Sequence, residues 1–307
     1  MDADLVAVVL AAGQGKRMKS SLVKVLHPLR GRPLVGHVLD AVRGAGASRL
    51  IVVVGVQADL VRARLEGEGV EFVDQGQPLG TAHAVLATRP ILGDFPGDVL
   101  VVCGDTPLLD AGDLRRLVQV RRRTGAPLAF LTTRPPDPTG YGRVIRDGHG
   151  RVTGIVEEAD CTPEQRRVDE VNAGVYCFAA PRMWAALEQV GRDNAQGEFY
   201  LTDAVGILTA AGEEVVGVPA PWERVVGVSN RADLARLEAA LRQERLGALM
   251  REGVAVVDPP SAFLDDTVEA ERDAVIAPDV VVEGRVRIRR GACIGPLAIV
   301  RQRDRRG

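Results

Sequence analysis

Hydrophobic residues in the first part of the chain form two different patterns. The segments Leu5–Leu10 and Arg49–Val54 contain unbroken apolar runs rich in β-branched residues, and each run ends at small residues. Such runs predict strands that are buried on both faces, as in parallel sheets. Leu34–Ala45 instead places its apolar residues on one side, at the spacing of an amphipathic helix.

The alternation of strand and helix continues beyond these segments. The sequence predicts helices near Asp59–Leu65 and from Thr81, and strands at Val70–Val73 and Val99–Val102. Strands that alternate with helices indicate an α/β fold with a doubly wound, Rossmann-like sheet. In such sheets ligands bind beyond the carboxyl ends of the strands.

From residue 127 onward the pattern changes and strands dominate. The predicted strands are Leu128–Thr132, Arg143–Arg146, Gly154–Val156, Val171–Phe178 and Val215–Pro219. We interpret the stretch that ends at Phe178 as a β-rich extension laid over the mouth of the sheet. The first domain is expected to span residues 1–229, and a linker helix to follow over residues 230–252.

The tail, residues 253–307, has a period of six. β-Branched residues recur at this spacing with glycines between them, at Ile276, Val282, Ile288, Ile294 and Val300. This period is typical of hexapeptide repeats and predicts the start of a left-handed parallel β-helix. An antiparallel meander is the alternative.

Composition limits the kinds of partner. With 46% hydrophobic and 26% charged residues, the chain suits a globular fold with a buried core. A net charge of −2 argues against nucleic acid as a partner. No apolar stretch is long enough for a membrane span, and Met1–Asp4 does not have the positive charge of a signal peptide. Four scattered cysteines fit a reducing compartment, so we expect a cytoplasmic location.

A glycine-rich loop follows the first predicted strand. Its sequence is Leu10-Ala11-Ala12-Gly13-Gln14-Gly15-Lys16-Arg17-Met18. Gly13 and Gly15 allow the backbone to approach an anion closely, and backbone amides after a strand bind phosphate well. Arg17 and Lys24 offer positive charge for phosphate oxygens. The chain has only three lysines, and all of them lie between residues 16 and 24.

A dinucleotide-binding loop is the least favoured interpretation of these glycines. Met18 stands where that fingerprint requires its third glycine, and no acidic residue follows the second strand at Val54-Gly55. The Walker sequence is also absent from the chain. A loop with cations downstream suits a triphosphate.

An acidic residue follows the strand Val99–Val102. Asp105 stands at the expected carboxyl end of this strand, where one or two carboxylates and substrate phosphates commonly hold Mg²⁺. A turn-forming aspartate before Pro107 is the alternative. Gln75 is a candidate for reading the edge of a base, and Gly80 for letting a base or ribose lie against the backbone. We expect His83 to be a packed helix residue.

Several motifs occur in an order that resembles a known family. They are LAAGQGKRM, QPLGTAHA, CGDTP, DPTGYGR, GIVEE, VNAG and DNAQGEFYLTD. Together they resemble the bacterial N-acetylglucosamine-1-phosphate uridyltransferase family, specifically the pyrophosphorylase half of its bifunctional members. The resemblance covers about residues 5–231, followed by the linker helix and the start of the β-helix.

This resemblance implies UTP and N-acetylglucosamine 1-phosphate as substrates, and UDP-N-acetylglucosamine and pyrophosphate as products. It places Arg17 and Lys24 at the phosphates and Asp105 on Mg²⁺. It implies that Gly142, Glu157 and Asn172 hold the amino sugar. It implies that Gly13, Gln75, Gly80 and Thr81 hold the uridine side, and the remaining substrate-binding candidates are Leu10, Ala11, Ala12 and Gly15.

The chain departs from the family pattern at the metal and in the tail. Ser229 stands where the family places an asparagine as second metal ligand, and Asn230 is adjacent. The last histidine is His149 and the tail offers few coils, so acetyl transfer is expected to be absent. A fragment of a longer protein is the alternative. A short β-helix is compatible with a homotrimer.

Two other functions stay open. One is a nucleotidyltransferase for another sugar 1-phosphate or base. The other is a non-catalytic nucleotide-binding assembly module.

Overall fold

The computed structural model describes residues 4–302 of the chain. Residues 1–3, which belong to the segment without signal-peptide charge, and residues 303–307 of the predicted tail domain lie outside the described residues. The chain divides into two compact units. One unit comprises the chain up to Leu26 together with Leu34–Val228, and the other comprises His27–Pro33 and the chain from Ser229 onward. The domain boundaries after residues 229 and 252 stay a prediction.

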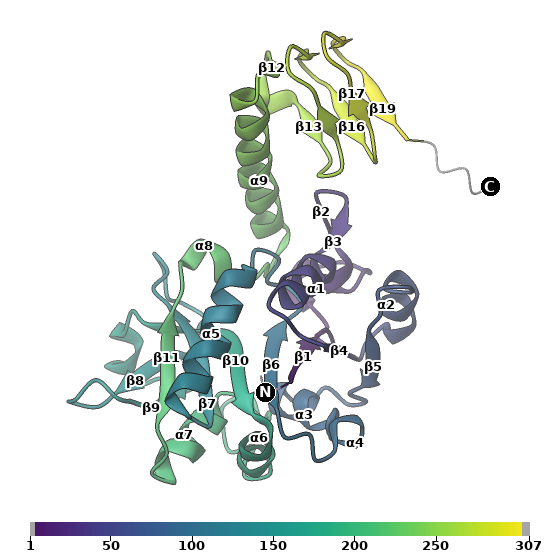
Figure 1. Cartoon of the computed structure of the whole chain (residues 1–307). Coiled ribbons are helices and arrows are strands. Elements are labelled where there is room, and N and C mark those ends of the chain that lie inside the picture. The colour runs from purple at the N-terminus through teal and green to yellow at the C-terminus, as the bar shows by residue number, and fades with distance from the viewer. Residues whose placement is uncertain (1–3, 303–307) are drawn as a thin grey trace. The chain divides into compact units, whose positions relative to one another are not determined.

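Within the described residues, the first unit contains a nine-stranded mixed sheet (Figure 1). Its main strand order is β11-β7-β10-β6-β1-β4-β5, and β8 and β9 lie off this path. The strands are β1 (Leu5–Leu10), β4 (Arg49–Val54), β5 (Glu71–Asp74), β6 (Asp98–Cys103), β7 (Leu128–Thr133), β8 (Arg143–Arg146), β9 (Val152–Val156), β10 (Val171–Ala179) and β11 (Val215–Pro219). The neighbours β6, β1, β4 and β5 are parallel, which confirms the predicted α/β sheet.

Helices cover both faces of this sheet (Figure 1). On one face, α1 (Leu34–Gly44), α2 (Ala58–Arg64) and α5 (Ala111–Thr124) contribute to the core that contains Leu5, Ala7 and Val9. On the other face, α3 (Thr81–Leu86), α4 (Arg89–Leu92), α6 (Ala180–Leu187) and α7 (Asp203–Ala210) contribute to the core around Val6 and Val8. The unbroken apolar run of β1 is therefore explained by burial on both faces, and the doubly wound arrangement is confirmed.

The unit also contains short helical turns. They are η1 (Lys16–Met18), η2 (Lys24–Leu26), η3 (Glu158–Asp160), η4 (Gln165–Arg167) and α8 (Trp222–Val225). The turns η1 and η2 interrupt the loop after β1, so this loop has local structure on both sides of residues 19–23.

The prediction that residues 128–178 form an extension over the sheet is wrong for β7 and β10. The strand β10 pairs antiparallel with both β6 and β7, inside the main sheet. Only β8 and β9 lie off the main path. The apolar residues of β7 and β10 are buried because both strands have helices on each side, for example Phe130 and Phe178 on one face and Leu131 and Cys177 on the other.

Strand directions bring several loops to one edge of the sheet. Parallel strands share a carboxyl edge, so the residues after β1, β4, β5 and β6 lie on the same side. Because β10 runs the opposite way, its first residues lie at that edge beside the end of β6. This edge therefore gathers the glycine loop, Gln75, Asp105 and Asn172.

The second unit consists of a hairpin, a long helix and a coiled tail. The hairpin is formed by β2 (Pro28–Leu29) and β3 (Arg32–Pro33), and the helix is α9 (Arg231–Arg251). Asn230 and Asp233 form a reciprocal capping box at the start of α9. None of the helices within residues 4–302 has the length and apolar character that crossing a bilayer requires.

The tail is built from short parallel strands. They are β12 (Ala255–Val256), β13 (Phe263–Leu264), β14 (Glu269–Ala270), β15 (Val275–Ile276), β16 (Val281–Glu283), β17 (Arg287–Ile288), β18 (Cys293–Ile294) and β19 (Ile299–Arg301), with the turn η5 (Pro259–Ser261). Each strand from β12 to β16 pairs in parallel with the strand three positions later in the chain, as β12 does with β15. The antiparallel alternative is therefore excluded for these strands. The pattern fits the start of a parallel β-helix, and its left-handedness stays a prediction.

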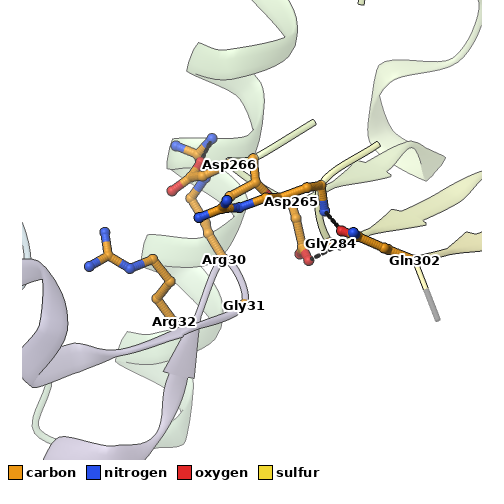
Figure 2. Close-up of a pocket in the computed structure, with 9 residues that line it drawn as sticks. Arg30, Gly31, Arg32, Asp265, Asp266, Gly284 and Gln302 are labelled. Atoms are coloured by element: carbon orange, nitrogen blue, oxygen red, sulfur yellow. Dashed lines mark hydrogen bonds and ion pairs between the residues drawn. The ribbon is translucent and has the colours of Figure 1, made fainter. Parts of the chain in front are cut away.

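A pocket of about 400 Å³ lies in this unit, between the hairpin turn and the coils (Figure 2). Arg30 forms an ion pair with Asp266, and its backbone amide donates to Glu238 over 2.8 Å. Asp265 accepts a hydrogen bond of 2.8 Å from the Gly284 amide. A Cβ on Gly31 would lie 3.0 Å from the Asp265 carboxylate, so this turn requires glycine. None of the predicted site residues lines this pocket.

Candidate active site

The glycine loop after β1 is open at Gly13 and tight at Gly15. A Cβ on Gly13 would meet nothing within 4 Å, so the backbone is accessible there. Gly15 has a φ of +59°, and a Cβ at this position would lie 2.7 Å from the Cβ of Lys24. Glycine is required at position 15 by both its backbone conformation and its contact with Lys24. The loop is therefore shaped around the stem of that lysine.

Lys24 and Asp105 form an ion pair at the carboxyl edge of the sheet. Their side chains are 18% and 19% exposed, so a ligand has access to both. The loop after β6 is fixed by two backbone hydrogen bonds, from Gly104 to Leu10 over 2.9 Å and from Val228 to Asp105 over 2.9 Å. The structure thus brings together the cation and the carboxylate that the sequence singled out.

Arg17 is not part of this pair. It lies in η1 with an exposed side chain, and within residues 4–302 it has no hydrogen-bond or ion-pair partner. Its guanidinium remains available to a phosphate.

The loop after β5 is anchored on residues 199–201. A Cβ on Gly80 would lie 2.6 Å from the Phe199 nitrogen, and the φ of Gly80 is +121°. Thr81 Oγ1 accepts a 2.9 Å hydrogen bond from the Leu201 amide. The buried Gln75 donates through Nε2 to the Gly80 carbonyl over 2.9 Å, so this half of its amide is already engaged. His83 stacks on Phe199 with a centroid distance of 6.2 Å, in agreement with a packed helix residue.

Gly142, Glu157 and Asn172 lie close together in the structure. The Asn172 amide donates to the Gly142 carbonyl over 2.8 Å. A Cβ on Gly142 would lie 3.3 Å from Glu157 Oε2, so only glycine leaves this carboxylate uncovered. Burial raises the pKa of the Glu157 carboxyl above its ordinary value, although a hydrogen bond from Thr202 opposes the shift. Gly142, Glu157 and Asn172 together form the Glu157 cluster.

Three residues of the site were missed by the sequence analysis. Thr202 Oγ1 donates to Glu157 Oε1 over 3.0 Å, and Asn172 Nδ2 donates to the Tyr176 hydroxyl over 2.6 Å. Burial, with the nearby Asp105 carboxylate, raises the pKa of the Cys103 thiol to about 12. Thr202 belongs to the DNAQGEFYLTD motif, which could have drawn attention to it. Cys103 is the first residue of the CGDTP motif, which could likewise have drawn attention to it, whereas Tyr176 lies within an apolar strand and gave no signal.

Cys103 links the two halves of the site. Its thiol donates to the Gly174 carbonyl over 3.8 Å, in the same segment as Asn172. The charges of Asp105, Lys24 and Glu157 all act on it. The ion pair and the Glu157 cluster are therefore close neighbours at one edge of the sheet.

The two candidates for a second protein ligand of the metal are Ser229 and Asn230. Asn230 Oδ1 accepts hydrogen bonds from the Ala232 and Asp233 amides at 2.8 and 3.0 Å, so its carbonyl is committed to capping α9. Ser229 begins the second unit, and its role as a ligand stays a prediction. No group of three or more His, Cys, Asp or Glu residues in the described part of the chain suits a metal ion. Any metal held by Asp105 would depend on substrate oxygens to complete its ligands.

The fold and these residues define a class of protein. A doubly wound sheet that presents a glycine loop, an ammonium–carboxylate pair and a polar cluster at its carboxyl edge is typical of transferases that act on nucleoside triphosphates. The chain belongs to the family of MobA-like NTP transferase domains, whose model matches residues 7–256.

Curated relatives give a narrower likeness. The chain is 48% identical over 277 residues to the "Bifunctional protein GlmU" of Pelotomaculum thermopropionicum, covering 90% of this chain and 60% of that protein. It is 45% identical over 300 residues to the protein of the same name from Geobacter metallireducens, with coverages of 97% and 63%. The protein of that name from Anaeromyxobacter sp. is 47% identical, with coverages of 96% and 61%. The resemblance to the bifunctional family is thus confirmed, and the chain spans about three fifths of the length of these relatives.

Proposed function

We propose that this protein transfers a uridylyl group from UTP to N-acetylglucosamine 1-phosphate and releases pyrophosphate. The observation that carries the proposal is the Lys24–Asp105 pair beside the glycine loop, with the Glu157 cluster next to it. The pair suits the phosphates of a triphosphate, and the cluster suits the hydroxyl and amide groups of an amino sugar. The relatives named "Bifunctional protein GlmU" support this choice.

The reaction requires no general base. The second pKa of a phosphate monoester is near 6, so the sugar phosphate is already anionic at neutral pH. One of its oxygens attacks the α-phosphorus, a new P–O bond forms, and the bond from that phosphorus to the leaving pyrophosphate breaks. Because two anions must meet, positioning and charge neutralisation account for most of the rate. We assign neutralisation of the leaving group to Lys24 and Arg17.

Asp105 is the residue that would hold Mg²⁺. Its carboxylate is a hard oxygen ligand of the kind Mg²⁺ prefers. Glycine at position 227 leaves one carboxylate oxygen uncovered, since a Cβ there would lie 3.7 Å from Asp105 Oδ1. The bound ion would supply positive charge to the substrate phosphates. A single carboxylate fits a site that is completed by those phosphates and their waters.

The test is pyrophosphate release from a panel of nucleoside triphosphates, with several sugar 1-phosphates, in Mg²⁺ or in EDTA. We expect turnover with UTP and N-acetylglucosamine 1-phosphate only when Mg²⁺ is present. Faster turnover with another triphosphate or with glucose 1-phosphate would replace the assigned substrates. Binding of UTP by calorimetry without any turnover would favour the non-catalytic module.

The β-helix coils support a homotrimer as part of the proposal. Phe263, Val281 and Ile299 lie in register on neighbouring strands. Phe263 and Ile299 are 44% and 64% exposed, which leaves an apolar ladder on one face of the coils. We expect sedimentation to give about three times the chain mass of 32.8 kDa, and Ile299→Glu to shift it to the single chain. A wild-type chain that sediments as a monomer at micromolar concentrations would exclude the trimer.

Glu157→Gln is predicted to raise stability and lower activity. Since burial raises the pKa of Glu157, the folded protein binds this proton more tightly than the unfolded chain does. The ionised carboxylate therefore destabilises the fold, and the destabilisation appears as pH rises from the unfolded pKa of about 4.3 through the raised folded pKa. Glutamine removes it, so the unfolding temperature should rise at pH 7 and the gain should shrink toward pH 4.

The activity of this variant should fall because a charged acceptor for a sugar hydroxyl is lost. We expect kcat/KM for the sugar phosphate to fall roughly 10- to 100-fold. Glu164→Gln is the matched control, because Glu164 is exposed, and it should change neither property. An unfolding temperature for Glu157→Gln at or below that of the wild type at pH 7 would show that the carboxylate does not destabilise the fold.

A further inference from the structure

The backbone that leads into Lys24 is held by hydrogen bonds to the side chain of Gln57, which lies far from it in the sequence. Residues 19–23 connect η1 to η2 without helix or strand structure. Gln57 Oε1 accepts a 2.8 Å hydrogen bond from the Val23 amide. Its Nε2 donates to the Ser21 carbonyl over 2.5 Å. Both ends of one amide thus bridge the backbone immediately before Lys24.

The backbone of Gln57 adopts a conformation that is unusual for a residue with a side chain. Gln57 follows β4 at the N-cap of α2 with a φ of 58° and a ψ of 35°, a left-handed conformation that favours glycine. Its side chain does not cap the helix it precedes. A strained position is therefore occupied by a residue whose side-chain amide bonds the backbone of the Lys24 segment.

The bridge restrains Lys24 from one side, and the core restrains it from the other. Val23 and Val25 flank the lysine and are both 3% exposed, within the core under α1. Gly15 packs closely against the Cβ of Lys24. The hydrogen bond to the Val23 amide holds the peptide that leads into Lys24.

We propose that Gln57 is a positioning residue that aims Lys24 at the leaving pyrophosphate. The inference deepens the proposed function and rests on it for the identity of the leaving group. Gln57 hydrogen-bonds the backbone of Ser21 and Val23 and acts on Lys24 through that backbone.

The test uses substitutions that separate strain from bridging. Gln57→Gly removes both hydrogen bonds and relieves the left-handed strain, so its two effects on the unfolding temperature oppose each other. Gln57→Ala removes the same hydrogen bonds but keeps the strain. It should therefore unfold at a lower temperature than Gln57→Gly and lose as much activity. Gln57→Glu keeps the acceptor for Val23 and loses the donor to Ser21, so its activity should be intermediate.

The decisive readout is a double-mutant cycle with Lys24→Ala, measured as pyrophosphate release by the full chain. Gln57→Gly should lower kcat roughly 10- to 100-fold in the wild-type background, with little change in KM for the sugar phosphate. In the Lys24→Ala background the same change should cost less than about 2-fold. Equal losses in the two backgrounds would overturn the proposal, as would a loss that only follows the unfolding temperature.

Calorimetric binding of inorganic pyrophosphate keeps this test independent of turnover. If no triphosphate is turned over, the proposed function fails, and pyrophosphate affinity still reports on Lys24. We expect Gln57→Gly to weaken binding roughly 10-fold in the wild-type background and not at all beside Lys24→Ala. Wild-type protein that does not bind pyrophosphate would overturn the role of Gln57 as well.

Discussion

The Asp105→Asn protein is expected to release pyrophosphate about 10²- to 10³-fold more slowly than the wild type. Asparagine keeps the shape of the side chain but removes the negative charge that pairs with Lys24 and would hold Mg²⁺. Both losses act where charge accumulates in the transition state, so kcat should fall more than the affinity for UTP. The measurement is steady-state pyrophosphate release over a series of Mg²⁺ concentrations.

Stability distinguishes this loss from unfolding. The Lys24–Asp105 pair is partly exposed, and pairs of this kind stabilise a fold by about 0–1 kcal/mol. The unfolding temperature of the variant should therefore stay within a few degrees of the wild-type value. A higher Mg²⁺ requirement would support Asp105 as a ligand. Unchanged turnover in a folded variant would remove Asp105 from the mechanism.

The sequence was sufficient to predict strands and helices whose pattern is local. Residues Leu5–Leu10 and Arg49–Val54 form strands with the predicted bounds because an unbroken β-branched run has few other ways to be buried. The place of β10 was not predictable in the same way. Its apolar run allows either direction and any neighbour, and the choice of β6 and β7 depends on partners remote in the sequence.

The same distinction applies to the site. The approach of Lys24 to Asp105 was predictable because each follows a strand of one parallel sheet, and parallel strands share an edge. Gln57 was not predicted, because its role comes from a hydrogen bond between residues 34 positions apart. Thr202 is 45 positions from Glu157, and its hydroxyl fits many other environments equally well. Side-chain partners of this kind are set by the tertiary fold and leave no local pattern in the sequence.

Asp98 is a further case that the sequence hides, and it carries the largest predicted effect on stability. It begins β6 with 1% of its side chain exposed. Arg121 and Arg122, at the end of α5, contact its two carboxylate oxygens at 2.7 and 2.6 Å. Asp98→Asn should lower the free energy of unfolding by about 3–5 kcal/mol, because buried guanidinium charge is left without its counter-charge. Chemical denaturation monitored by circular dichroism measures this loss.

Asp94→Asn is the matched control, since Asp94 is exposed, and it should change the free energy of unfolding by less than about 0.5 kcal/mol. Arg122 is more exposed than Arg121, at 30% against 14%, so Arg122→Leu should destabilise the fold less than Asp98→Asn does. The carboxylate, which meets both arginines, is thus expected to matter more than either cation. A loss below 1 kcal/mol for Asp98→Asn would mean that α5 is held on the sheet by its apolar contacts, Leu114 and Leu117 among them.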